Sequence, residues 1–311
     1  MSNKMPARFT NEDAARKHLE AIQWPDGPVC PHCGVLDRAS AISGGRPGLY
    51  FCGACRTQYT VTVGTVMERS KVPLHIWLYC NHLLCSSKKG LSSHQMARML
   101  GVTYKTAWFL TMRLRKAMEV TPGSEPPLGG PGKIVEADEA YIGKKDGKRK
   151  HPGSGGAGHK RTVLSLVERG GKIRSFKLGS STKAEIVPAL LANVNRKSTL
   201  HTDGAQVYKY TRAAAVHESV DHNKEFVREG RTGPVHTNTL EGFFSVFKRG
   251  MVGTYQHCGE QHLQRYLAEF DFRMNHRVKL GYSDDMRADM ALKGINGKRL
   301  TYRRTDKASV N

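Results

Sequence analysis

The chain has 311 residues, with 49 Lys or Arg against 27 Asp or Glu, so its formal net charge at pH 7 is +22. This length allows about two domains, and a hydrophobic fraction of 39% is too high for a wholly disordered chain. No run of about 18 apolar residues exists, which excludes a transmembrane span, and residues 1–20 lack the apolar core of a secretion signal. The charge excess favours a polyanionic partner, with nucleic acid ahead of an anionic membrane.

Four of the seven cysteines form two C-x-x-C pairs that are separated by 18 residues: Cys30, Cys33, Cys52 and Cys55. Each pair can present two thiolates from a tight turn, and four thiolates close a tetrahedral site, so this spacing predicts structural zinc. Two coincidental buried pairs or a redox C-x-x-C are the alternatives. The other three cysteines are scattered and odd in number, which is a poor framework for disulfides and indicates a reducing compartment.

Short β-prone stretches flank these cysteines at residues 49–51 and 58–63, as the hairpins of a zinc ribbon require. We therefore assign residues 1–70 to a zinc ribbon with an N-terminal helix.

Residues 71–120 have the pattern of a helix-turn-helix region. A short helix capped by Ser92 is expected over 93–100, a Gly-containing turn over 101–103 and a longer helix over 104–118. Because the second helix of this motif enters the major groove, we expect its basic side chains to bind DNA. These are Lys105, Arg113, Arg115 and Lys116. The alternative is an ordinary helical hairpin with a charged outer face.

Residues 121–132 are rich in Pro and Gly, which exclude helix and central strand, and predict a linker. A second Gly-rich and Lys-rich stretch over 143–160 is expected to be a loop or hairpin tip. Its charge either contacts phosphate groups or is simply solvated.

Beyond the linker the pattern becomes strand-rich, with strands expected over 133–142, 162–168, 173–178 and 199–204 and a helix over 183–194. Period-two geometry places Glu136 and Asp138 on one face of the first strand and Glu139 on the other. Asp203 follows the last strand, where open mixed sheets place their ligands. An Asp before Gly is also a common turn residue.

A helix is expected over residues 236–249, capped by Thr237 or Asn238. Glu241 and Lys248 are seven residues apart, so they lie two turns apart on one face. Alternatively, Glu241 is a first-turn acid and Lys248 a last-turn base that both face the helix dipole.

Three segments, in this order, carry a resemblance to a known family. They are Glu-Ala-Asp138-Glu-Ala-Tyr-Ile-Gly, then His-Thr-Asp203-Gly, then His-Thr-Asn-Thr-Leu-Glu241-Gly-Phe-Phe-Ser-Val-Phe-Lys248-Arg-Gly. This series resembles the DDE transposases of bacterial insertion sequences, in the ISXO-like group with an N-terminal zinc ribbon. Residues 253–257 and 263–277 also match, so the resemblance covers about residues 15–280.

The resemblance implies an α+β or α/β multidomain fold, in which the zinc ribbon and helix-turn-helix are followed by an RNase H-like mixed-sheet catalytic domain over 133–280. Residues 281–311 remain as a basic C-terminal extension, either contacting DNA or frayed. By the resemblance, Asp138, Asp203 and Glu241 bind Mg²⁺ (or Mn²⁺) and Lys248 contacts DNA, where we also expect Arg249. Asn238 is the alternative to Glu241 at the third acidic position.

Cutting or joining DNA is an in-line displacement at phosphorus, which two divalent cations can activate, and Mg²⁺ prefers carboxylate oxygen. We therefore expect a transposase that binds terminal inverted repeats and catalyses Mg²⁺-dependent strand cleavage and strand transfer. Its partners would be the transposon ends and target DNA, on which it would act as a homodimer or larger oligomer. We expect it in the cytoplasm with the nucleoid and no membrane partner.

Two other functions fit parts of the pattern. A non-catalytic DNA-binding regulator would use the zinc ribbon and helix-turn-helix alone, and an RNase H-like nuclease would hydrolyse strands without joining them. For His201, His236 and His257 we favour hydrogen bonding around the site over metal ligation.

Overall fold

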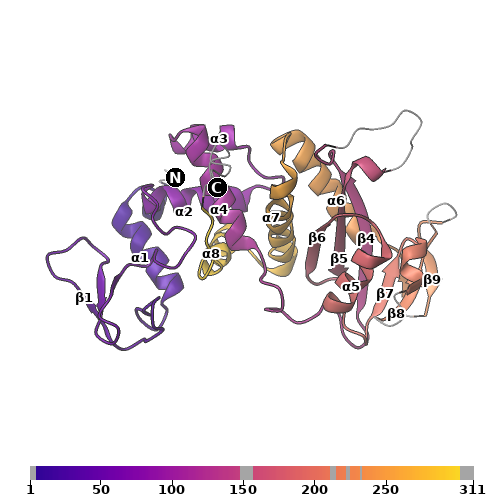
Figure 1. Ribbon diagram of the computed structural model, residues 1–311, viewed down its shortest axis with the longest axis horizontal. Helices are drawn as coiled ribbons and strands as arrows, with labels where there is room; N and C mark the ends of the chain where they lie inside the picture. Colours follow the sequence, from indigo (N-terminus) through magenta and orange to yellow (C-terminus); the bar gives the residue numbers. More distant parts are fainter. Residues whose placement is uncertain (1–4, 148–156, 211–214, 222–224, 232, 302–311) are drawn as a thin grey trace, which may run out of the picture. The chain divides into compact units, whose positions relative to one another are not determined.

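The computed structural model describes residues 5–147, 157–210, 215–221, 225–231 and 233–301. The chain divides into two compact units, coloured along the sequence in Figure 1. Unit 1 comprises Met1–Glu119 with Gly281–Asn311, and unit 2 comprises Val120–Leu280. The first boundary lies at the start of the expected linker, and the described residues 281–301 group with unit 1. Among the described residues, no helix is both long enough and apolar enough to cross a membrane.

Unit 1 begins with α1 (Glu12–Gln23), whose first turn is capped by the side chain of Asn11. An antiparallel three-stranded sheet follows, with strand order β1–β2–β3. Its strands are β1 (Ala39–Ala41), β2 (Tyr50–Cys52) and β3 (Gln58–Tyr59). β3 is shorter than the strand expected over 58–63, because a turn closes where Val63 N–H donates to Thr60 O at 3.0 Å. Trp24, Tyr50 and Tyr59 pack their rings against one another beside the cysteines.

Three helices of unit 1 follow in the expected order: α2 (Leu74–Ser86), α3 (Ser93–Leu100) and α4 (Tyr104–Met118). Ser92 caps α3 and Thr103 caps α4 through hydrogen bonds of 3.2 Å to backbone N–H groups of the first turn. Gly101 ends α3 in the left-handed conformation at φ 64°, as the sharp turn between the helices requires. Helices α2, α3 and α4 pack against one another.

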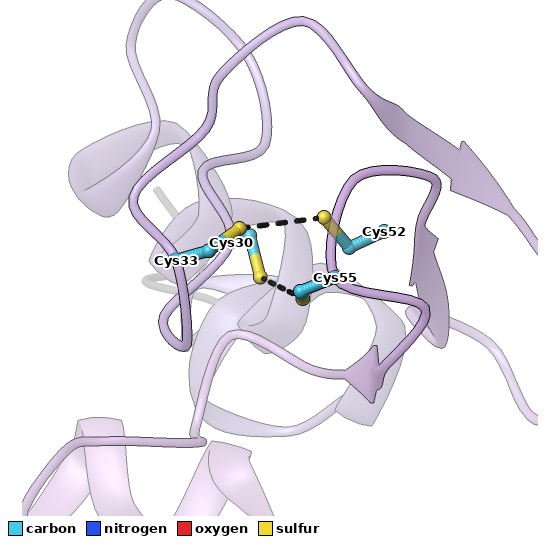
Figure 2. A group of neighbouring side chains, drawn as sticks. All are labelled: Cys30, Cys33, Cys52 and Cys55. Atoms are coloured by element: carbon cyan, nitrogen blue, oxygen red, sulfur yellow. Dashed lines mark hydrogen bonds between the residues drawn. The ribbon is translucent and has the colours of Figure 1, made fainter.

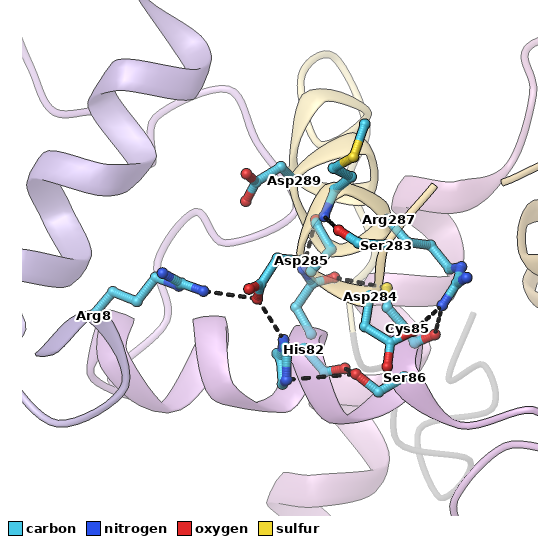
Figure 3. Close-up of polar contacts among 12 residues, drawn as sticks. Arg8, His82, Cys85, Ser86, Ser283, Asp284, Asp285, Arg287 and Asp289 are labelled. Atoms are coloured by element: carbon cyan, nitrogen blue, oxygen red, sulfur yellow. Dashed lines mark hydrogen bonds and ion pairs between the residues drawn. The ribbon is translucent and has the colours of Figure 1, made fainter. Parts of the chain in front are cut away.

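The chain returns to unit 1 as α8 (Asp284–Lys293), which packs against α1, α2 and α4. Figure 3 shows the polar contacts that fix it. Asp285 accepts from Arg8 at 2.7 Å, and its Oδ1 lies 3.2 Å from Nδ1 of His82. The buried guanidinium of Arg287 donates to the carbonyl oxygen of Cys85 at 3.0 Å. Residues 281–301 are therefore part of the core of unit 1.

Unit 2 contains a five-stranded mixed sheet with strand order β6–β5–β4–β7–β8. The strands are β4 (Ile134–Ile142), β5 (Arg161–Glu168), β6 (Ile173–Leu178), β7 (Thr199–Thr202) and β8 (Val216–Ser219). The first three pair antiparallel, whereas β7 pairs parallel with both β4 and β8. A separate hairpin joins β9 (Arg228–Gly230) and β10 (Gly233–Val235).

Helices cover both faces of this sheet (Figure 1). Val135 and Ala137 of β4 pack with Ile186 and Leu190 of α5 (Lys183–Asn193) in one buried cluster. On the other face lie α6 (Asn238–Gly250), which packs on β4 and β5, and α7 (Leu263–Asn275), which packs on β6. A mixed sheet with helices on both faces is the α+β arrangement expected of an RNase H-like domain.

The remaining elements are short 3₁₀ helices and one π helix. The 3₁₀ turns are Ala7–Phe9, Ala157–His159, Gln206–Tyr210, Glu260–His262 and Val278–Leu280, and a π turn spans Met251–Tyr255. Of the loop expected over 143–160, residues 148–156 lie outside the described residues.

Two candidate metal centres

The four cysteines of the ribbon converge on one point (Figure 2). Sγ of Cys30 lies 3.6 Å from Sγ of Cys55, and Sγ of Cys33 lies 3.6 Å from Sγ of Cys52. All four sulfur atoms lie within 4.8 Å of one another. A tetrahedral zinc site with Zn–S bonds of about 2.3 Å has sulfur–sulfur edges of about 3.8 Å, so the geometry fits a closed four-thiolate site.

Two turns of the same kind produce this convergence. Gly34 follows the first pair with φ 76°, and its N–H donates to Cys30 O at 2.8 Å. Arg56 follows the second pair with φ 56°, and its N–H donates to Cys52 O at 2.8 Å. In both turns the left-handed residue closes the chain back onto the carbonyl oxygen of the first cysteine of the pair. At Arg56 this conformation is strained for a residue with a Cβ atom.

Register brings the first two acids of unit 2 together. Parallel pairing of β4 with β7 places Glu136 opposite His201, so continuing two residues along each chain brings Asp138 beside Asp203. Glu139 joins them, because one oxygen from each of Asp138, Glu139 and Asp203 lies within 4.8 Å of the other two. We call these three residues the carboxylate cluster.

Each member of the carboxylate cluster is held by a hydrogen bond. Asp138 Oδ1 accepts from the N–H of Glu139 at 2.7 Å, and Asp203 Oδ1 accepts from the N–H of Ala205 at 3.0 Å. Glu139 Oε1 accepts from the hydroxyl of Tyr208 at 2.8 Å. The side chains are thus oriented before any ligand is bound.

Burial and neighbouring negative charges weaken the acidity of Asp138 and Glu139 in the carboxylate cluster. Burial raises the pKa of Asp138 to about 7, and the charges of Asp203, Glu139 and Glu241 act in the same direction. Burial also raises the pKa of Glu139 to about 7, with Asp203 adding to it and the Tyr208 hydroxyl opposing it. Hard divalent cations prefer such oxygen donors and would neutralise this repulsion, so the donor set fits Mg²⁺ or Mn²⁺.

Helix α6 places the other predicted site residues around this cluster. Glu241 is exposed on the first turn and accepts from the Thr237 hydroxyl at 3.5 Å. Its charge acts on Asp138, although it is not one of the three acids with mutually close oxygens. Asn238 is the exposed first residue of α6, and Lys248 and Arg249 are exposed in its last turn.

The three histidines that we expected near the site differ in burial. His201 is fully buried, and burial together with the Arg169 charge lowers its pKa to about 4. His236 is half-buried, and its pKa is lowered mainly by burial, with the Arg169 charge acting the same way. Both rings accept from Arg169 through Nδ1, at 3.2 Å and 3.3 Å. His257 is exposed. The first two rings are therefore neutral hydrogen-bonding groups beside the cluster.

Two of the expected DNA contacts on α4 do not lie on an exposed face. Arg115 is 1% exposed and donates to the Thr111 hydroxyl at 3.2 Å. Arg113 is 9% exposed and donates to the carbonyl oxygens of Leu300 and Glu68. The second half of α4 is enclosed by the rest of unit 1, so side chains off its apolar stripe are buried as well. Lys105 is exposed, and Lys116 forms an ion pair with Glu119.

Sequence reasoning missed three residues of unit 2 that the structure places at the site. Glu139 joins the carboxylate cluster although strand alternation assigns it to the opposite face. Glu136, to which we assigned no role, contacts the start of α6, and Arg169 contacts Glu136. The only signal was the run of three acids within four positions of one strand. No pattern in the sequence pointed to Arg169.

A mixed sheet with clustered carboxylates, joined to a four-thiol ribbon, defines the zinc-ribbon class of DDE transposases. Two family models match the chain in the corresponding places. Residues 127–275 match the ISXO2-like transposase domain, and residues 10–58 match the transposase zinc-ribbon domain. The chain therefore belongs to the ISXO2-like transposases, which confirms the family resemblance.

A relative from Halobacterium salinarum (strain ATCC 700922 / JCM 11081 / NRC-1) is described as an uncharacterized protein in transposable element ISH50. It is 29% identical over 296 residues, which cover 86% of this chain and 93% of the relative. A chain in the cryo-EM structure of a simian T-cell lymphotropic virus intasome with PP2A regulatory subunit B56 gamma is 14% identical, with a TM-score of 0.29. The match covers 57% of this chain and 63% of that one, and at this TM-score it carries no argument.

Proposed function

We propose that this transposase binds the terminal inverted repeats of an insertion sequence and catalyses Mg²⁺-dependent strand cleavage and strand transfer. The observation that supports this most is the carboxylate cluster, formed where two parallel strands run side by side within residues 127–275. Glu139 and Asp203 both raise the pKa of Asp138, as expected of acids that share a cation.

In this proposal Asp138 and Asp203 hold the divalent cations, with Glu241 facing them from α6. When bound, the cations activate the attacking oxygen and stabilise the leaving oxygen at phosphorus. Asp138 and Asp203 contribute by fixing their oxygens in advance through backbone N–H groups. Lys248 and Arg249, exposed two turns along α6 from Glu241, bind the phosphate backbone and orient the DNA.

The DNA-reading surface that we propose for unit 1 is the exposed part of the helix-turn-helix. The recognition helix of this motif contacts base edges with its N-terminal residues. In α4 these are Tyr104 and Lys105, both exposed, and Arg98 of α3 is exposed before the turn. Lys105→Ala should weaken binding to the end sequence by about 1–3 kcal/mol and relax specificity at one base position. Arg113 supports the fold of unit 1 in this proposal.

The test is a cleavage assay with the full chain, Mg²⁺ and a duplex that carries the end of its element. We expect cleavage and joining by the unmodified chain. Asp138→Asn or Asp203→Asn should slow cleavage by about a thousandfold, because several kcal/mol of transition-state stabilisation would be lost. Affinity for the DNA should stay nearly unchanged. Glu168→Gln is the matched control, since Glu168 pairs with Lys133 away from the cluster.

The outcomes separate the proposed reactions. Cleavage retained in both Asp variants would remove those acids from the mechanism. DNA binding without metal-dependent breakage by the unmodified chain would indicate a non-catalytic regulator, and hydrolysis without joining would indicate a simple nuclease. Comparing Glu241→Gln with Asn238→Ala decides the third acidic position, for which we propose Glu241 because its charge already acts on Asp138.

A further inference from the structure

The first turn of α6 is capped by a side chain from the sheet. Glu136 is fully buried on β4, and its Oε2 accepts from the N–H groups of Thr239 at 3.0 Å and Leu240 at 3.3 Å. Its Oε1 accepts from the Thr239 hydroxyl at 2.8 Å. The residue at the helix N-cap, Thr237, makes no capping hydrogen bond itself. Glu136 therefore satisfies backbone donors that a helix end would otherwise leave unpaired.

Arg169 holds Glu136 from the turn between β5 and β6. Its Nε donates to Glu136 Oε1 at 3.0 Å, its Nη1 donates to Pro234 O at 3.0 Å, and its Nη2 donates to His236 O at 3.2 Å. One planar guanidinium thus joins β4 to the segment that leads from β10 into α6. Only an arginine has donors in this fixed fork, so a lysine could reproduce the charge but not the set of contacts.

The network continues into the sheet through His201. A guanidinium can only donate, so His201 Nδ1 accepts from Arg169 and the ring proton sits on Nε2. That Nε2 lies 3.8 Å from Oε2 of Glu218 on β8. Arg169 is therefore fixed both from the α6 side and from β7.

We propose that Glu136 and Arg169 are positioning residues for the acidic site. Glu241 lies two residues beyond Thr239, in the same first turn that Glu136 holds. Asp138 lies two residues beyond Glu136 on the same strand. The pair of Glu136 and Arg169 thus ties the turn that carries Glu241 to the strand that carries Asp138. The part of this inference that concerns catalysis rests on the proposed function.

Mn²⁺ binding to the full chain without DNA, followed by electron paramagnetic resonance, tests this role. Arg169→Lys keeps the charge and removes the fork, so Mn²⁺ affinity should fall by about ten- to a hundredfold, as for residues that orient metal ligands. Thr239→Val removes only the hydroxyl donor to Glu136 and should give a smaller loss in the same direction. The Mn²⁺ concentration for half-maximal DNA cleavage should rise in parallel.

Arg174→Lys is the matched control. Arg174 lies on β6 and makes a similar set of contacts, to Glu125 Oε2 at 3.2 Å, Pro126 O at 2.7 Å and Asn193 Oδ1 at 3.2 Å, but none of them reaches α6. Its lysine variant carries the same change and should keep the parent affinity for Mn²⁺. A general loss of stability would affect both lysine variants and lower the melting temperature without a selective effect on Mn²⁺.

The positioning role is overturned if Thr239→Val and Arg169→Lys both melt near the parent and bind Mn²⁺ within about twofold of it. If Arg169→Lys does not fold, the milder Thr239→Val decides alone. An unmodified chain that binds Mn²⁺ but never cuts DNA refutes the proposed function and leaves the positioning role standing. An unmodified chain that binds no Mn²⁺ refutes both.

Discussion

Unit 1 and unit 2 each gather a group of metal-ligating side chains, but from very different lengths of chain. The four thiols lie between Cys30 and Cys55 and are oriented by two local turns of the same kind. The carboxylates come from two neighbouring strands, with Glu241 on a helix a hundred residues beyond the first acid. The register of β4 with β7 brings Asp138 beside Asp203, and we propose that Glu136 positions the helix turn that carries Glu241.

The two groups also differ in what they do to the fold before a metal arrives. Four thiolates close a tetrahedral site and leave no open position, so zinc binding there contributes to folding. Burial raises the pKa of Asp138 and Glu139, and the charge of Asp203 adds to both, so the empty acidic site opposes folding when these acids are ionised. A closed site stabilises its unit, whereas the open acidic site stores repulsion that a bound divalent cation would relieve.

The largest effect is expected from breaking the thiol group. Cys30→Ser should abolish zinc binding and unfold the ribbon, because structural zinc contributes on the order of 10 kcal/mol in such sites. Zinc content and circular dichroism measure this. Cys258→Ser is the control, since Cys258 lies in unit 2, and it should keep one zinc per chain. Full zinc content in the Cys30 variant would show that the four thiols do not act together.

A smaller effect should follow from loosening the C-terminal segment of unit 1. Ile295 is fully buried, so Ile295→Ala should lower the free energy of unfolding by about 2–5 kcal/mol. Hydrogen exchange at the amides of α2, against which α8 packs, should accelerate. Met286→Ala, at a side chain that is 51% exposed, should change stability by less than about 0.5 kcal/mol. Unchanged exchange in α2 would mean that this segment is not part of its cooperative unit.

Without added Mg²⁺ or Mn²⁺, the raised pKa values in the acidic site should make the free energy of unfolding depend on pH. Because the pKa values of Asp138 and Glu139 rise to about 7, the folded chain binds these protons more tightly than the unfolded chain, whose values are near 4. This stabilisation is complete below about pH 4 and is lost as the pH rises through about 7. Chemical denaturation across this range measures it, and Asp138→Asn should flatten the profile. A zinc-loaded chain without Mg²⁺ or Mn²⁺ that gains stability between pH 5 and pH 7 in step with Asp138 ionisation would contradict the sign.

The smallest effect is expected from removing the hydrogen bond that Tyr208 donates to Glu139. Tyr208→Phe removes the hydroxyl that stabilises ionised Glu139, so the midpoint of the pH dependence of Mn²⁺ binding should rise by up to about one pH unit. Tyr210→Phe is the control, because Tyr210 is 56% exposed and outside the cluster. A midpoint that does not move would separate Glu139 from the cation site.

Local patterns made much of this molecule predictable. The cysteine spacing, the Ser92 cap and the period-two strand over Ile134–Ile142 depend on neighbouring residues, and the structure has them as expected. The family resemblance predicted that Asp138 and Asp203 act together, and the parallel register of β4 with β7 places them side by side.

The remaining features depend on contacts between distant residues. Glu136 and Arg169 are 33 residues apart, and neither has a local signal for the other. Arg113 and Arg115 lie off the apolar stripe of α4, but the stripe does not reveal that the second half of the helix is enclosed. Strand alternation separates Asp138 from Glu139, yet the Asp138 side chain turns back to its neighbour's N–H, which brings their oxygens together.

The most direct measurement of the acidic site is a crystal structure of the full chain with Mn²⁺, in which anomalous scattering locates the ion. An ion should lie within about 2.6 Å of carboxylate oxygens of both Asp138 and Asp203. If saturating Mn²⁺ leaves these two carboxylates without an ion between them, or binds only elsewhere, the acids are not the metal centre of this transposase.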